Sequence, residues 1–242
     1  MKKKGKNRET RFYTGMAAML LFMIGDWLLD VKGAGNQEIG VFVNTNWQKM
    51  SMWRFEASIL LAAVAQPLYW IGIQGMQELV RERCMQQESC MQNQTKHSAR
   101  MHKIFRVGSM SCVLSCLFIH IMCCLMPIIC KTVFAYQGDF QMAADITNEI
   151  GIYIIAPFMV YYLVADVGIS IATGYLVISQ RLKVPKWMVV FNPLGGLVLC
   201  EILTSIPYDW CHDLAAATES FGHLLMFAVG LYAVKCSNKM QQ

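Results

Sequence analysis

Charged residues are scarce in this chain. Asp, Glu, Lys and Arg make up 15% of its 242 residues, 55% are hydrophobic, and the mean hydropathy is +0.38. So few charges do not fit the surface of a water-soluble domain, and so much apolar surface does not fit a disordered chain. The 17 Gly follow no triplet period, and the 10 Cys lie mostly inside apolar runs, so collagen-like and disulfide-framework proteins are excluded. The composition predicts a polytopic membrane protein.

Several motifs of known chemistry are also missing. The sequence has no Walker A loop, no HExxH, no GxSxG and no two CxxC pairs at zinc spacing. Transport by this chain alone would therefore have to use an ion gradient. No catalytic signature is complete, so an enzyme is not the favoured prediction, and cofactors and metal binding are left open.

Six apolar runs are long enough to cross a bilayer, which takes about 20 mostly apolar residues. The first contains Asp26 and Asp30 and lacks a good processing site, so it is not a cleavable signal peptide. The predicted fold is an all-α polytopic membrane helix bundle, one domain over residues 1–242, with six transmembrane helices at about 12–30, 55–76, 104–130, 150–178, 187–206 and 214–234.

The Lys and Arg residues predict the orientation. They gather near residues 2–11, 81–106, 181–186 and 235–239, whereas the connection at 131–149 carries one cation against three acids and the connection at 207–213 carries two acids and no Lys or Arg. Since cytoplasmic loops hold the Lys/Arg excess, both termini are predicted to be cytoplasmic, in a cell membrane. The net charge of +5 is thus mostly an orientation signal and gives no reason to expect nucleic acid; the lipid bilayer is the expected partner.

Polar side chains at membrane depth are the candidate functional residues. An ionisable group at the bilayer centre costs about 2.5–3.5 kcal/mol on insertion scales, so each needs a partner, a cavity or a function. We expect them to converge on one interior cavity, although Glu201 lies near enough to the outer interface to be simply hydrated. The candidates for binding a substrate or ion are Asp26, Gln66, His120, Asp166, Asn192, Glu201, Glu219 and His223.

Asp166 is the most central acid by span counting. With Tyr162, Ser170 and Thr173 it forms a polar stripe on one helix face, because residues three, four or seven apart share a face. A stripe of this kind would suit substrate or proton movement along the helix. We therefore expect Asp166→Asn to matter most for activity.

A second stripe, Cys112, Cys116, His120 and Cys124, has the spacing of four that a soft-metal site on a helix would use. A thiolate in hydrocarbon is costly, however, and Cys is a small residue that suits close helix packing. Packing is therefore the preferred interpretation of these cysteines.

Three short correspondences suggest an internal duplication. Residues 24–26 (IGD) resemble 164–166 (VAD), 66–68 (QPL) resemble 192–194 (NPL), and 118–121 (FIHI) resemble 221–224 (FGHL). Three spans per half would invert the second copy relative to the first. The segments around Pro67 and Pro193 would then be broken helices that face each other near mid-membrane, although matches this short can also arise by coincidence.

The segments Gly25-Asp26-Trp27-Leu28-Leu29 and Pro67-Leu68-Tyr69-Trp70-Ile71-Gly72 resemble small bacterial multi-spanning membrane proteins of a domain of unknown function. The resemblance covers about half the chain. It implies a bacterial cytoplasmic membrane and no particular activity or catalytic residue.

Three functions are compatible with these features. The leading hypothesis is a secondary transporter of a small solute or cation, with Asp26, Asp166, His120 and His223 lining a polar cavity. The second is a membrane-embedded hydrolase or isomerase for a lipid-like substrate, in which Glu219 and His223 act as acid and base or bind a metal. The third is a non-catalytic subunit whose interior polar groups bond helix to helix.

Overall fold

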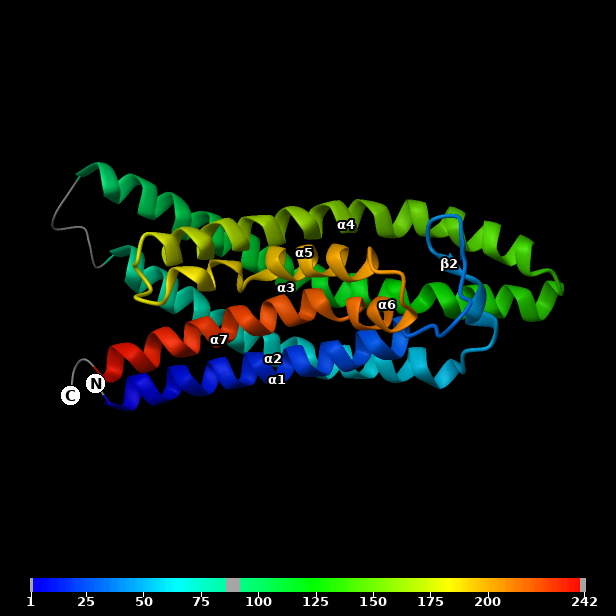
Figure 1. Ribbon diagram of the computed structural model, residues 1–242, viewed down its shortest axis with the longest axis horizontal. Coiled ribbons are helices and arrows are strands. Elements are labelled where there is room, and N and C mark those ends of the chain that lie inside the picture. The colour runs from blue at the N-terminus through cyan, green and yellow to red at the C-terminus, as the bar shows by residue number, and fades with distance from the viewer. Residues whose placement is uncertain (1, 86–91, 240–242) are drawn as a thin grey trace.

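The computed structural model describes residues 2–85 and 92–239, which form an all-α bundle of elongated shape (Figure 1). This confirms the predicted fold class. The helices are α1 (Lys2–Asp30), α2 (Met52–Met85), α3 (Gln92–Gln137), α4 (Phe140–Ile178), α5 (Pro193–Thr204), α6 (Asp209–Ala215) and α7 (Thr218–Lys239), with the short 3-10 helices η1 (Thr45–Gln48) and η2 (Lys186–Val190). The strands β1 (Glu38–Ile39) and β2 (Val43–Asn44) form one small antiparallel hairpin.

Five helices, α1, α2, α3, α4 and α7, are long and apolar enough to cross a membrane. Their outward faces carry large apolar side chains, among them Leu60, Leu114 and Val164, which are 67%, 70% and 67% exposed. Contiguous apolar surface on this scale is unfavourable in water, because each such side chain gains about 1.5–3 kcal/mol when it leaves water. The surroundings that fit these helices are the hydrocarbon of a lipid bilayer.

The predicted span 187–206 is not one continuous helix. It is divided into η2 and α5, which join at Asn192 and Pro193. Asn192 is extended (φ −157°, ψ 172°), as expected for a residue before proline, and its side-chain oxygen caps α5 by accepting from the Gly195 amide at 3.1 Å. At 12 residues α5 is about 18 Å long, too short to cross a bilayer alone. Five of the six predicted spans are therefore single membrane-length helices.

The start of α1 and the end of α7 lie at the same end of the bundle as the end of α2 and the start of α3 (Figure 1). Polar contacts join the elements there: Arg8 donates to both oxygens of Glu82 at 2.8 and 2.6 Å, and Lys235 donates to the Tyr13 hydroxyl at 2.8 Å. The basic segments that were predicted to share one side of the membrane are thus gathered at one end.

The opposite end is closed in part by an ordered connection, residues 31–51, which contains the β-hairpin. Asn148 of α4 holds the hairpin: its side-chain oxygen accepts from the Val41 and Phe42 amides at 3.0 and 2.9 Å, and its amide nitrogen donates to the Ile39 carbonyl at 2.8 Å. Lys131 of α3 donates to the Trp47 carbonyl at 2.9 Å. The connection therefore runs from α1 across this end of the bundle and contacts α3 and α4.

Glycines allow α7 to approach α5 closely. A Cβ built on Gly222 would lie 2.7 Å from the Asn192 carbonyl oxygen and 3.1 Å from Gly196 Cα. Backbones can come this near only where neither residue has a side chain, as in the small-residue crossings of membrane helices. This crossing sets the position of α7, and so of His223, one residue further along the chain.

The crossing can be tested with two Gly→Ala substitutions. Gly222→Ala should lower the apparent melting temperature of the detergent-purified protein by several degrees, because overpacking costs about 1–3 kcal/mol. Gly168→Ala is the control, since its Cβ would meet only Ile104 Cγ2 at 3.7 Å and alanine favours a helix. Equal melting temperatures for the two variants would show that the α5–α7 crossing is not as close as described.

Candidate functional site

Five of the eight candidate residues lie in one polar region inside the bundle. Asp26 of α1, His120 of α3, Asp166 of α4, and Glu219 and His223 of α7 meet there, although they are up to 197 positions apart in sequence. They form two Asp–His pairs with Glu219 between them. The paired side chains come from α1 with α3 and from α4 with α7.

The first pair joins Asp26 and His120, whose Oδ1 and Nδ1 atoms are 3.3 Å apart. Ser220 donates to Asp26 Oδ2 at 2.7 Å, and Ser58 Oγ lies 2.8 Å from His120 Nε2. Because Ser58 donates its own proton to the Gly25 carbonyl at 2.8 Å, its oxygen is left to accept from His120. His120 Nε2 therefore donates to Ser58, and its Nδ1 atom faces the Asp26 carboxyl group.

The second pair joins Asp166 and His223, whose Oδ1 and Nε2 atoms are 3.2 Å apart. Both residues are buried: Asp166 is 0% and His223 2% exposed. The Cys112 thiol donates to Asp166 Oδ1 at 3.3 Å, and the Tyr69 hydroxyl lies 3.2 Å from His223 Nδ1 and 3.5 Å from Cys112 Sγ. Asp166 Oδ2 has no hydrogen-bond partner among the described residues.

Six residues, two on each of the helices α3, α4 and α7, form two layers, and the second pair belongs to one of them. Cys112 and Cys116 on α3, Asp166 and Tyr162 on α4, and His223 and Glu219 on α7 are each four residues apart, so each couple stacks on one helix face. Since α3 runs opposite to α4 and α7, the residues Cys116, Tyr162 and Glu219 form the layer nearer the hairpin end (Figure 1). The layer of Cys112, Asp166 and His223 lies about one helical turn, 5.4 Å, deeper.

A cavity of about 350 Å³ leads to the upper layer. Asp26 and His120 line it, and so do Cys116, Tyr162 and Glu219, together with apolar side chains of α1, α3 and α4. Asp166, His223 and Cys112 are not among its lining residues. The first pair is therefore accessible from the hairpin end, whereas the second pair is closed off beneath Glu219 and Tyr162.

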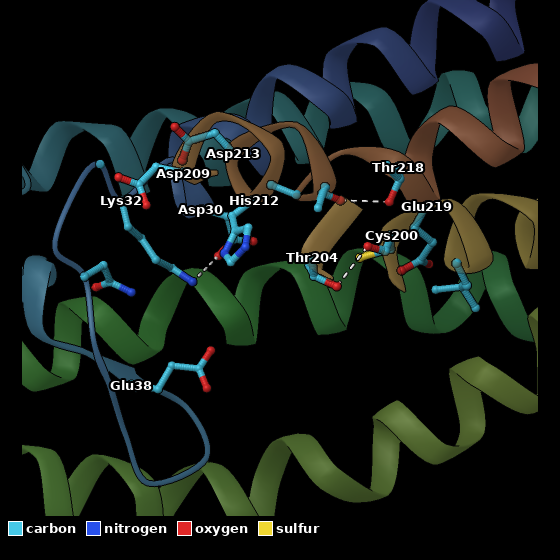
Figure 2. Close-up of a pocket in the computed structure, with 15 residues that line it drawn as sticks. Asp30, Lys32, Glu38, Cys200, Thr204, Asp209, His212, Asp213, Thr218 and Glu219 are labelled. Atoms are coloured by element: carbon cyan, nitrogen blue, oxygen red, sulfur yellow. Dashed lines mark hydrogen bonds and ion pairs between the residues drawn. The ribbon is translucent and has the colours of Figure 1, made fainter. Parts of the chain in front are cut away.

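A second cavity of about 370 Å³ adjoins the first, and Asp30, Lys32, Glu38, Ala216 and Glu219 line both. Figure 2 labels the acids that line it, which come from α1, α6, α7 and the hairpin connection: Asp30, Glu38, Asp209, Asp213 and Glu219. Its basic lining residues are Lys32, which pairs with Asp30 at 3.2 Å, and His212. The mouth of the polar region is thus strongly acidic.

Gln66, Asn192 and Glu201 lie outside this polar region. Gln66 donates to the Val113 carbonyl and so joins α2 to α3, Asn192 caps α5, and Glu201 is exposed on α5. Pro67 is exposed within the continuous helix α2, whereas Pro193 is buried at the first position of α5. The two proline segments therefore do not combine their amides in one site.

The polar stripe predicted on α4 is also divided. Tyr162 and Asp166 face the interior region, but Ser170 accepts from the Leu194 amide at 3.0 Å and so joins α4 to α5. Thr173 bonds the Ile169 carbonyl of its own helix at 2.8 Å. Ser170 and Thr173 therefore bond to the backbone of α5 and α4 and do not extend the polar region.

The sequence did not predict that Tyr69 and Ser58 belong to the polar region, or that the cysteine stripe faces it. Cys112 contacts Asp166, Cys116 lines the cavity, and Cys124 donates to Ser58 at 3.3 Å. The spacing of four from Cys112 to Cys124 was the available signal, because the same helix face carries His120. Tyr69 and Ser58 gave no signal, since both are common inside helices that pack closely.

The two pairs can be separated by double-mutant cycles on melting temperature. Asp26→Asn with His120→Gln, and Asp166→Asn with His223→Gln, should be non-additive by about 1 kcal/mol or more, because the partners are in contact. The crossed combination of Asp26→Asn with His223→Gln is the control and should be additive within about 0.5 kcal/mol. Equal coupling in all three cycles would contradict the assignment of the pairs.

Comparison with known proteins identifies one family. The model of a family of unknown function, DUF6796, matches residues 1–237. No curated protein and no solved structure matches the chain.

Proposed function

Since the chain belongs to DUF6796, a family of unknown function, we propose from the geometry alone that it is a secondary carrier of a small cation. The observation that carries this proposal is the acidic cavity that reaches the pair Asp26–His120, with the buried pair Asp166–His223 beneath it. A cleft lined by one sign of charge within low-dielectric walls concentrates ions of the opposite sign. Anions and phosphate-bearing lipids are repelled by the same lining, so a cation is the favoured substrate.

The position of the two pairs supports an inverted repeat as the basis of the carrier. Asp26–His120 belongs to the first three helices and Asp166–His223 to the last four. The two aspartates end one of the short sequence correspondences, and the two histidines lie in another. In this proposal α1 corresponds to α4, α3 to α7, and α2 to the broken segment η2–α5. Corresponding helices then run in opposite directions, as they do in inverted-repeat transporters.

Alternating access follows from this arrangement. The pair Asp26–His120 lines the open cavity, and the pair Asp166–His223 is closed off. If the two halves exchanged conformations, Asp26–His120 would be closed off and Asp166–His223 would open toward the other end of the bundle. A cation that enters is held first by the carboxylates of Asp26 and Glu219 and then by that of Asp166. At each pair the cation becomes a partner of the carboxylate.

The topology in this proposal has six crossings, in which η2 and α5 together make the fifth. The basic end of the bundle, with both termini, faces the cytoplasm, and the acidic cavity opens to the outside. The described conformation is then the outward-open one, in the cytoplasmic membrane of a bacterial cell.

The test is charge movement in proteoliposomes on a solid-supported membrane, after concentration jumps of Na⁺, K⁺, Mg²⁺, Mn²⁺ and Zn²⁺. At least one cation should give a saturable current, and Asp26→Asn should reduce it at least tenfold, because the open pair loses its carboxylate. Glu201→Gln removes the same charge from an exposed site on α5 and should leave the current unchanged. Absence of a saturable current with every cation, or equal loss in both variants, would reject the carrier.

A further inference from the structure

The deeper layer contains three metal-binding side chains from three different helices. Cys112 Sγ, Asp166 Oδ1 and His223 Nε2 all lie within 4.8 Å of one another, and all three residues are buried. The separations are 3.3 Å from sulfur to oxygen, 3.2 Å from oxygen to nitrogen and 4.0 Å from sulfur to nitrogen. Ligands of a tetrahedral zinc ion with bonds of 2.0–2.3 Å are about 3.3–3.8 Å apart, so the present spacing needs little adjustment.

We propose that Cys112, Asp166 and His223 bind a divalent transition-metal ion of the zinc class, and that such an ion is the cation carried. The second part rests on the proposed carrier function, whereas the binding site stands on the geometry of the three side chains. Thiolate, imidazole and carboxylate together favour Zn²⁺ or Co²⁺ over Mg²⁺, Ca²⁺ and the alkali ions, which prefer oxygen ligands alone. Three protein ligands leave a fourth position open for water or for Glu219.

Charge balance favours an ion at this depth. When the ion binds, the Cys112 thiol loses its proton and His223 binds as the neutral imidazole. One thiolate, one carboxylate and one divalent ion sum to zero charge, which removes the cost of an isolated thiolate in a low-dielectric interior. Asp166 is 0% exposed, and its Oδ2 atom has no hydrogen-bond partner among the described residues, so this carboxylate is not fully satisfied without an ion.

Tyr69 is placed to orient two of the ligands. Its hydroxyl can accept from His223 Nδ1–H and donate to Cys112 Sγ, the two atoms that it contacts at 3.2 and 3.5 Å. A proton on Nδ1 leaves the Nε2 lone pair directed toward Asp166 and the metal position. Metal-binding histidines in proteins commonly donate their other ring N–H to a neighbouring oxygen in this way. Tyr69 is therefore a positioning residue of the proposed site.

Glu219 connects this site to the cavity. It lines both cavities, lies close to Tyr162 and Asp166, and its Oε1 atom has no hydrogen-bond partner among the described residues. On α7 it stands one turn above His223. An ion drawn into the acidic mouth meets this carboxylate before it reaches the three ligands.

Cobalt binding to the reduced, metal-free protein in detergent tests the site. We expect one equivalent of Co²⁺, the visible bands of tetrahedral cobalt and a near-ultraviolet thiolate-to-cobalt charge-transfer band, with displacement by Zn²⁺. Cys112→Ser should abolish the charge-transfer band, Asp166→Asn and His223→Gln should weaken binding at least tenfold, and Tyr69→Phe should weaken it about 10- to 100-fold. Cys84→Ser removes a buried thiol outside the polar region and should bind as the wild type does.

X-ray absorption of the zinc-loaded wild type avoids any variant that does not fold. One sulfur at about 2.3 Å with nitrogen and oxygen ligands supports the site. A folded wild type that binds no Co²⁺ or Zn²⁺, a zinc shell without sulfur, or a charge-transfer band that survives in Cys112→Ser would overturn it.

Uptake by proteoliposomes separates the site from the carrier. Zn²⁺ uptake that Cys112→Ser abolishes supports both proposals. Cobalt binding in detergent without uptake of any cation rejects the carrier and supports a resident metal centre at the same three ligands. Uptake of another cation without cobalt binding overturns the metal site and leaves the carrier standing.

Discussion

The constraint on which the rest of this structure depends is that a carboxylate at membrane depth needs a partner. Asp26 is paired with His120 and Ser220, and Asp166 with His223 and Cys112. Each contact joins helices distant in sequence, and an unpaired partner would leave a charge uncompensated in the interior. The pairs therefore fix which faces of α1, α3, α4 and α7 point inward, and the apolar faces that remain are the ones that meet lipid.

Helix geometry arranges the polar residues around these pairs in two successive layers. Residues four apart on α3, α4 and α7 stack into two polar layers, and the close glycine crossing brings α7 near enough to take part in both. The layer nearer the hairpin end lines an acidic cavity, and the deeper layer is closed off from it. A difference in access between two similar sites is what an alternating carrier requires, and the proposed metal site gives the sealed layer a chemical role.

The sequence was enough to predict the fold class and five membrane-length helices, because long apolar runs and ionisable residues within them carry strong physical signals. The same reasoning anticipated that Asp26, His120, Asp166, Glu219 and His223 would converge. The cysteine stripe with Cys112 was noted as a possible metal site but interpreted as packing, and Tyr69 gave no signal, because its role depends on which helices become neighbours. Of the six predicted runs, the fifth lost its continuity at Asn192-Pro193, where local backbone restriction outweighed apolar composition.

The central claim is that the two halves exchange access to the paired sites when a cation binds. The most direct measurement is the distance between spin labels placed as unnatural amino acids at Trp53 on α2, in the first half, and Ser205 at the end of α5, in the second half, which are both exposed. The account predicts two distance populations in nanodiscs whose ratio shifts when Zn²⁺ is added, and no shift in Asp26→Asn. A single distance that stays unchanged at saturating Zn²⁺, in protein shown to bind the ion, would contradict it.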